Sequence, residues 1–197
     1  MVKVARKTKE TQIELRLQRA ASPPRGAVVS TTLPFFDHML STLLRYAGID
    51  GEVKASGDLS HHIVEDVAIA VGRAVRELVP PSCARYGERT IPMDDALVHA
   101  AIDVGGRYYF AGQVPNALHT HAMRSFAEHL GATLHVRILA GSDRHHLIEA
   151  GWKAIGLSLR DAMASGDSLF STKGSVEWSI EHEAPGRDPS APDESEA

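Results

Sequence analysis

The pentapeptide His61-His62-Ile63-Val64-Glu65 (HHIVE) returns almost unchanged as His145-His146-Leu147-Ile148-Glu149 (HHLIE), at an offset of 84 residues. The same offset superimposes further residues along the chain: Gly57 on Gly141, Ala70 and Gly72 on Ala154 and Gly156, and Arg76 on Arg160. A shared pattern of this length indicates an internal duplication, and so long a period favours two half-domains over a solenoid.

Apolar periodicity predicts the same order of elements in both halves. Ile13, Leu15 and Leu17 alternate with polar residues as in a half-buried strand, whereas the apolar residues behind Pro34 recur at helical spacing. The predicted elements are strands at 11–17, 27–32 and 51–56 with helices at 34–46 and 62–78, then strands at 95–103, 107–113 and 132–139 with helices at 118–130 and 145–163. We expect an α+β fold of two β-β-α-β-α half-domains, residues 1–92 and 93–180, in which helices cover one face of a sheet.

The overall composition limits the class of protein. The chain has 197 residues, of which 43% are hydrophobic and 23% charged, as in ordinary soluble globular proteins. Its formal net charge of -4 argues against general nucleic-acid binding, which depends on clustered Lys and Arg. No apolar run is long enough for a membrane span, and the polar N-terminus does not resemble a signal peptide.

The single cysteine, Cys83, excludes a disulfide framework and favours a reducing compartment, so we expect a cytoplasmic protein. Residues 181–197 are acidic, rich in Pro and poor in large apolar side chains. This composition predicts a disordered tail.

The two repeated motifs can bind metal if they lie on helices. Positions i and i+4 share a helix face, so His61 with Glu65, and His145 with Glu149, can each offer an imidazole nitrogen and a carboxylate to one ion. The adjacent His62 and His146 point about 100° away and would serve another site, on a neighbouring half or subunit. His38 and His135 are candidates for the remaining ligands.

Six histidines and two glutamates suffice for two ions, each with three imidazoles and one carboxylate. Such ligands suit Mn, Fe, Co, Ni or Zn, and ligand type alone does not choose among them. The other histidines are expected to be surface or hydrogen-bonded core residues: His99, His119, His121, His129 and His182. His119 and His121 form an H-x-H pair that can bind metal, but nothing around it resembles a site.

From about residue 5 to residue 175, the chain resembles the imidazoleglycerol-phosphate dehydratases of histidine biosynthesis. The motifs that carry the resemblance are, in order, RKTKETQIELRL, FFDHML, HHIVEDVAIAVGRAV, RYGERTIPMDDAL, IDVGGRYY, TLHVRIL, HHLIEAGWKAIGLSLR and STKG. The resemblance implies a duplicated fold of the ribosomal protein S5 domain 2-like type, whose trimers pack into a hollow 24-subunit particle. It also implies two Mn²⁺ ions per active site, completed between subunits, and a lyase that converts D-erythro-imidazole glycerol phosphate to imidazole acetol phosphate and water.

The resemblance further implies roles for single residues. Glu10 matches the acid/base carboxylate that contacts the substrate, and Glu65 and Glu149 are assigned as catalytic carboxylates that also bind metal. The residues assigned to the substrate phosphate are Arg85, Arg107, Lys153, Ser171, Thr172 and Lys173. Arg offers a planar pair of donors and Lys a point charge, and both suit phosphate.

One stretch departs from the family pattern. The family carries an acidic pair directly before the first histidine pair, in a slightly longer loop, whereas this chain has Ser60 beside His61 in the sequence GDLSHH. Asp58 could replace the missing carboxylate if the short loop folds back, and partners of metal-binding histidines affect both affinity and activity.

Two other classes of function stay open on the residues alone. A dinuclear metal-dependent hydrolase would use the same ligands to cleave a phosphate ester, and it would release free phosphate. A metal-storage or structural particle would use the histidines only to join subunits. In that case Glu10 and the basic residues would be dispensable.

Overall fold

The computed structural model describes residues 1–166. The first half of the described chain contains β1 (Val2–Lys7), β2 (Thr11–Arg19), β3 (Ala27–Ser30), α1 (Pro34–Tyr46), β4 (Ile49–Gly57) and α2 (Ser60–Leu78). The second half contains β5 (Tyr86–Met93), β6 (Ala96–Val104), β7 (Tyr109–Ala111), α3 (Ala117–Leu130), β8 (Ala132–Ala140) and α4 (Arg144–Ala162). The predicted α+β class and internal duplication are confirmed.

Each half builds one four-stranded mixed sheet with the same strand order. The orders are β1-β2-β4-β3 and β5-β6-β8-β7. In both sheets the last pair is parallel and the other pairs are antiparallel. Equal topology in two separate sheets is what a duplicated half-domain predicts.

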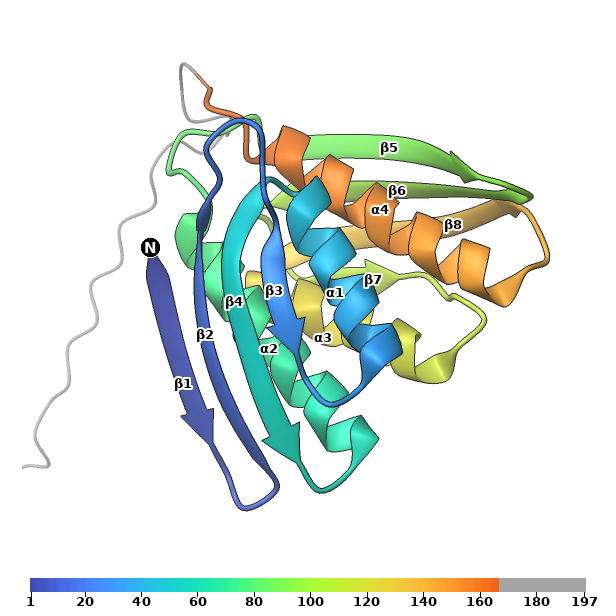
Figure 1. Ribbon diagram of the computed structural model, residues 1–197. Coiled ribbons are helices and arrows are strands. Elements are labelled where there is room, and N and C mark those ends of the chain that lie inside the picture. Colours follow the sequence, from blue (N-terminus) through green and yellow to red (C-terminus); the bar gives the residue numbers. More distant parts are fainter. Residues whose placement is uncertain (167–197) are drawn as a thin grey trace, which may run out of the picture.

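The four helices lie between the two sheets (Figure 1). α2 packs against β1 and β2 of the first sheet, and α4 packs against β5 and β6 of the second. Across the middle, α1 contacts α4 and α2 contacts α3, so each helix pair joins the two halves. The largest fully buried side chains in this interior include Trp152, Phe126, Met39, Leu43 and Ile155.

Two glycines at equivalent positions allow the helix pairs to approach closely. A Cβ atom on Gly72 of α2 would lie 2.7 Å from the carbonyl oxygen of Phe126 on α3. A Cβ atom on Gly156 of α4 would lie 2.7 Å from the carbonyl oxygen of Leu43 on α1. These are the two glycines that the sequence repeat aligns.

The structure adds one strand to each half, so that each is β-β-β-α-β-α. β1 has only Val2 and Val4 as large apolar residues, too short an alternation to indicate a strand. β5 contains Gly87 and Pro92, which disfavour strands but are tolerated because β5 lies at the edge of its sheet.

The offset between the halves changes by one residue inside β8. Gly48 and Gly131, with φ of 70° and 74°, occupy equivalent left-handed positions before β4 and β8, at an offset of 83. In β8 the pairing with β6 then shifts, because Leu97 pairs with Ala140 but Val98 pairs with Ile138. This bulge leaves Leu139 as an extra residue. The offset therefore becomes 84 at α2 and α4.

In the described part of the chain, no helix is both long and apolar enough to cross a membrane. The predicted tail, residues 181–197, lies outside the described residues, as do Ser171, Thr172 and Lys173.

Candidate metal centre

Two clusters of side chains between facing helices each offer three ligand atoms that lie within 4.8 Å of one another. The α4 cluster consists of His38, His145 and Glu149. The α2 cluster consists of His61, Glu65 and His121. Each cluster takes a histidine and a glutamate from one half of the chain and its second histidine from the other half.

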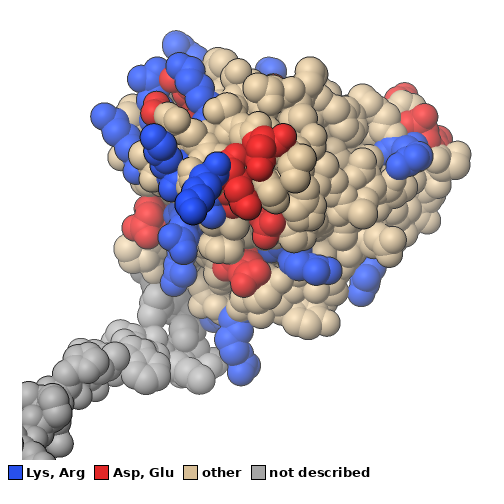
Figure 2. All heavy atoms as spheres, turned by 90° about the horizontal axis from the view of Figure 1, so that it is seen from below, with Lys and Arg blue, Asp and Glu red and all other residues tan. Residues whose placement is uncertain are grey.

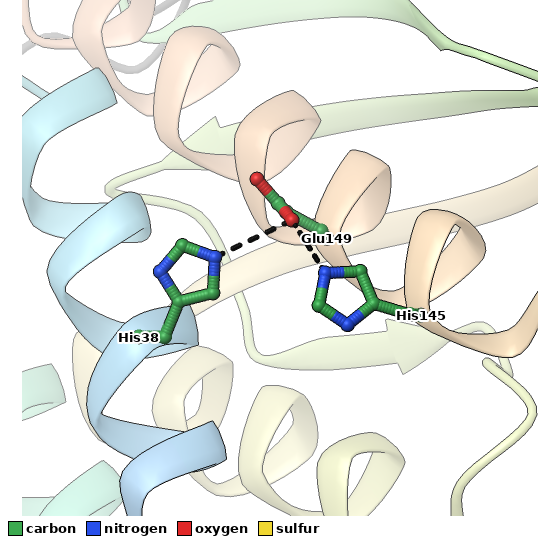
Figure 3. Close-up of side chains that lie close together, drawn as sticks. All are labelled: His38, His145 and Glu149. Carbon is green, nitrogen blue, oxygen red and sulfur yellow. Dashed lines mark hydrogen bonds and ion pairs between the residues drawn. The ribbon is translucent and has the colours of Figure 1, made fainter.

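In the α4 cluster, Glu149 lies between the two imidazole rings (Figure 3). Its Oε2 atom is 3.0 Å from Nε2 of His145 and 3.4 Å from Nε2 of His38. His145 and Glu149 share a face of α4 because they are one helical turn apart, whereas His38 reaches across from α1. Glu149 is only 7% exposed and both histidines are exposed, so the carboxylate forms the floor of the cluster.

The α2 cluster has the corresponding arrangement. Oε2 of Glu65 is 3.6 Å from Nε2 of His61, and Oε1 is 3.4 Å from Nε2 of His121. The rings of His61 and His121 are stacked with centroids 4.9 Å apart. Nε2 of His121 is buried and has no hydrogen-bond partner among the described residues.

The donor sets fit a divalent transition metal. Imidazole nitrogen with carboxylate oxygen suits Mn, Fe, Co, Ni or Zn, and three protein ligands leave coordination positions open. A buried imidazole nitrogen without a hydrogen bond is unfavourable. A metal ion next to Glu65 would satisfy Nε2 of His121.

The surroundings of Glu149 favour its ionised form, which is the form that binds a metal ion. Burial alone raises the pKa of its carboxyl group, but Lys153, His145 and His38 outweigh this effect and bring the pKa below its ordinary value. Nζ of Lys153 lies 2.9 Å from Oε1 of Glu149. The carboxylate is therefore ionised at neutral pH.

The histidines that the structure brings together differ in part from those predicted. His38, His61 and His145 lie in the clusters, and so does His121, which was expected to be a surface or hydrogen-bonded core residue. Aligning the halves at Gly48 and Gly131 superimposes His121 on His38, since both offsets are 83. The bulge in β8 hides this match from an alignment anchored on the repeated motifs.

His135 belongs to neither cluster. It lies on β8 between the buried Leu134 and Val136, so its side chain points to the opposite face of the second sheet, away from the helices. Its ring centroid is 5.5 Å from that of Tyr109. Within one chain, His135 is thus separated from the residues that it was predicted to join.

His62 and His146 point away from the clusters, as their helix positions predict, and each contacts carboxylates. Nδ1 of His62 lies 2.8 Å from Oδ1 of Asp58, so the shortened loop does bring a carboxylate to this histidine. Nδ1 of His146 lies 2.8 Å from Oδ1 of Asp95. The hydrogen bond to Asp58 raises the pKa of His62, and the hydrogen bond to Asp95 raises the pKa of His146.

Glu10 and Asp95 occupy equivalent turns, each directly before the second strand of its half. Asp95 is held firmly, because its Oδ2 accepts from the backbone N–H groups of Ser142 and Asp143. These bonds and His146 keep the pKa of Asp95 far below its usual range. Glu10 is held less tightly, since its nearest charged partner in the described chain is His62, at 3.8 Å.

A pocket of about 710 Å³ opens beside the α4 cluster. Four basic residues line it together with His38 and Glu149: Arg25, Arg45, Lys153 and Arg160. Among the predicted phosphate-binding residues that the structure describes, Lys153 alone lines this pocket. Arg85 lies elsewhere, bonded through Nε to Oδ1 of Asp103 at 2.7 Å, and Arg107 lies in the loop before β7.

Comparison with known proteins gives a consistent family assignment. Residues 31–159 match the family model described as imidazoleglycerol-phosphate dehydratase. The imidazoleglycerol-phosphate dehydratase of Pyrobaculum aerophilum is 43% identical over 185 residues, which cover 86% of this chain and 96% of that protein. That of Deinococcus radiodurans is 40% identical over 191 residues, covering 88% and 97%.

Solved structures share the fold. A crystal structure of the Pyrococcus furiosus enzyme in complex with (S)-C348 superimposes with a TM-score of 0.77 at 33% sequence identity. The superposition covers 88% of this chain and all of that chain. A structure of the Staphylococcus aureus enzyme gives a TM-score of 0.74 at 27% identity, covering 83% and 98%.

Proposed function

This chain belongs to the imidazoleglycerol-phosphate dehydratase family, and we propose that it removes water from D-erythro-imidazole glycerol phosphate to give imidazole acetol phosphate in cytoplasmic histidine biosynthesis. The observation that carries the proposal is the pair of histidine–glutamate clusters between facing helices. A substrate with an imidazole ring is itself a ligand for the open metal positions of such clusters.

The proposed cofactor is Mn²⁺, with two ions per active site. His38, His145 and Glu149 would hold one ion, and His61, Glu65 and His121 the other. His62 and His146 remain candidates to complete the sites of a neighbouring subunit in an assembly of trimers and a 24-mer. When bound, the ions act as Lewis acids toward the imidazole ring.

The remaining steps fall to side chains of this chain. Glu10 is proposed to transfer the proton as general acid/base, and its loose environment next to His62 supports this role because its carboxylate is free to turn toward a substrate. Lys153 and the basic residues of its pocket are proposed to bind the phosphate. Arg85, Arg107, Ser171, Thr172 and Lys173 remain phosphate candidates that would act across subunits.

The decisive experiment measures two products in one sample. The full chain is loaded with manganese and given imidazole glycerol phosphate, and imidazole acetol phosphate and inorganic phosphate are both quantified. We expect the keto product without phosphate release, and loss of the product in chelator.

Free phosphate without keto product would instead show a phosphate-ester hydrolase. A fully metallated protein that forms neither product would favour a storage or structural particle. Neither the described residues nor the relatives reported above favour these alternatives.

A further inference from the structure

The turn that carries Glu10 is tied to helix α2 by a chain of hydrogen bonds. In this turn, between β1 and β2, Oγ1 of Thr8 accepts from the backbone N–H of Glu10 at 3.1 Å and of Thr11 at 3.0 Å. The Thr8 and Thr11 hydroxyls are 3.2 Å apart. Thr11 Oγ1 then donates to Oδ2 of Asp66 on α2 at 2.5 Å.

Asp66 is a buried carboxylate at the centre of this network. It is 8% exposed, and Thr11 is 4% exposed. Nη1 of Arg6 on β1 donates both to Asp66 and to Thr11, so the buried charge is paired. Burying a carboxylate costs desolvation free energy even when it is paired with a cation. The presence of Asp66 at this position therefore calls for an explanation other than stability.

The second half of the molecule shows that the fold does not require the network. The sheet register and the helix offset make Ile91, Ala96 and Ala150 the counterparts of Arg6, Thr11 and Asp66. All three counterparts are apolar, and the equivalent turn is held instead by Asp95 itself, through the backbone of Ser142 and Asp143. In the first half the turn is therefore held through Thr8 and Thr11, and among the described residues the charged partner of the Glu10 carboxylate is His62, at 3.8 Å.

The helix positions connect this network to the site. Asp66 follows Glu65 of the α2 cluster and lies one helical turn after His62, the nearest charged partner of Glu10. The turn, the start of α2 and the loop before it meet at one end of the molecule (Figure 1). Seen from that end, acidic side chains gather in the middle of the face, with Lys and Arg along the side of the first sheet (Figure 2).

We propose that Thr11 is a positioning residue that, bonded to the buried carboxylate of Asp66, holds the Glu10 turn in register with the metal-binding face of α2. The inference rests on the proposed dehydratase function and on the acid/base role of Glu10. Thr11 acts only through Glu10, so removing its hydroxyl has no further effect once the Glu10 carboxylate is gone.

The test is a double-mutant cycle with Glu10→Gln and Thr11→Val in the manganese-loaded full chain. We expect Thr11→Val to lower kcat by about tenfold to a hundredfold, since small misplacements of a catalytic group are costly. KM and metal content should stay near wild-type values. Adding Thr11→Val to Glu10→Gln should cause no further loss of kcat, because the two residues act as one unit.

Three further variants control for a purely structural effect. Thr11→Ser keeps the hydroxyl and should restore most of the turnover. Thr8→Ala removes the acceptor for the Glu10 amide at an exposed position, so it should lower kcat without threatening folding. Ser158→Ala removes a buried hydroxyl that donates to the carbonyl of Ala100, remote from the turn, and should leave kcat unchanged.

Additive effects of Glu10→Gln and Thr11→Val would overturn the proposal, and so would wild-type kcat in Thr11→Val and Thr8→Ala. If Glu10→Gln itself turns over normally, the role of Glu10 fails first and the positioning role fails with it. A loss in Glu10→Gln combined with normal turnover in Thr11→Val leaves the dehydratase assignment intact and rejects only the inference.

Discussion

At the scale of single residues, the buried Nε2 atom of His121 supports metal binding at the α2 cluster. It lies 3.4 Å from Glu65 and has no hydrogen-bond partner in the described chain. Leaving a polar atom buried in this way costs about 1–3 kcal/mol. A ligand role explains why the position carries a histidine rather than an apolar residue.

We expect His121→Ala to lose metal at the α2 cluster, with binding weakened by about tenfold or more, as when ligands or their immediate partners are changed. His135→Ala is the matched control and should bind metal as the wild type does, because His135 lies on the opposite face of the second sheet. Elemental analysis after dialysis against limiting manganese measures both. Loss of metal in His135→Ala alone would contradict the cluster seen in the structure.

His119, two residues away, is a buried histidine of a different kind. It is 4% exposed, and its Nδ1 accepts a hydrogen bond of 3.2 Å from Nε1 of Trp152. Burial lowers the pKa of His119 from 6.5 to about 4. Below about pH 6.5 the imidazole of His119 is therefore protonated in the unfolded chain but still neutral in the folded protein.

The free energy of unfolding should fall as the pH drops from about 6.5 to about 4, with His119 contributing on the order of 3 kcal/mol. His119→Gln keeps an acceptor for Trp152 without a titrating group, so its stability should depend less steeply on pH in this range. Chemical denaturation in chelator measures this effect apart from metal release. His99→Gln, on the outer face of the second sheet, is the control, and an equal pH dependence in wild type and His119→Gln would refute the assignment.

At the scale of elements, the site depends on how closely two helix pairs approach. His38 reaches Glu149 because α1 packs tightly on α4, and at Gly156 this contact leaves no room for a Cβ atom. Gly72 has the same place between α2 and α3. The repeated glycines thus link the packing of the core to the geometry of the ligands.

Gly156→Ala should push α1 from α4, because the new Cβ would meet backbone at 2.7 Å. We expect a loss of about 1–3 kcal/mol in stability and weaker metal binding at the α4 cluster. Gly151→Ala on the same helix is the matched control, since its nearest neighbours are 3.5 Å away and helix propensity favours Ala by about 1 kcal/mol. Denaturation of the metal-free protein measures the stability of both variants, and metal titration measures their affinity for metal. Equal stability and affinity in Gly156→Ala and Gly151→Ala would contradict the role of Gly156 in helix packing.

The helices were predictable because each has a clear apolar face. The predicted helix at 34–46 matches α1, and those at 62–78 and 145–163 match α2 and α4 to within two residues at each end. β1 and β5 were not predicted, since edge strands bury little and β5 contains Gly87 and Pro92. Their pairing is decided by the neighbouring strand rather than by their own periodicity.

The candidate site was predictable where its residues share one helix and not where they meet across helices. The spacing of His61 and Glu65 is a local property of α2. The contact between His121 and Glu65 depends instead on the packing of α2 against α3, and the bulge at Leu139 displaces the alignment that would have revealed it. Local geometry is encoded in spacing, whereas a contact between halves requires the tertiary structure.

At the scale of the whole molecule, each cluster links the two halves of the chain. The α4 cluster joins α1 of the first half to α4 of the second, and the α2 cluster joins α2 to α3. A metal that binds only this folded arrangement stabilises it by mass action, by about 2.7 kcal/mol at a hundredfold excess over Kd. For a chain of this length, that corresponds to roughly 5–10 °C in Tm.

Removing the metal should therefore lower Tm by several degrees and, if His62 and His146 complete sites in neighbouring subunits, should also split the assembly. Both effects should reverse when manganese is returned, because the ligands remain in the chain, whereas magnesium should restore little, since it disfavours nitrogen ligands. Size-exclusion chromatography with light scattering follows the assembly, and calorimetry follows Tm.

The paired variant His62→Ala with His146→Ala separates the effect of metal on stability from its effect on assembly, because it keeps both three-residue clusters. It should still gain thermal stability from manganese but should no longer assemble in response to it. Stripped protein that keeps the mass and Tm of the loaded form would contradict the coupling of metal to assembly, and metal-driven assembly of the paired variant would remove these two histidines from the contact between subunits.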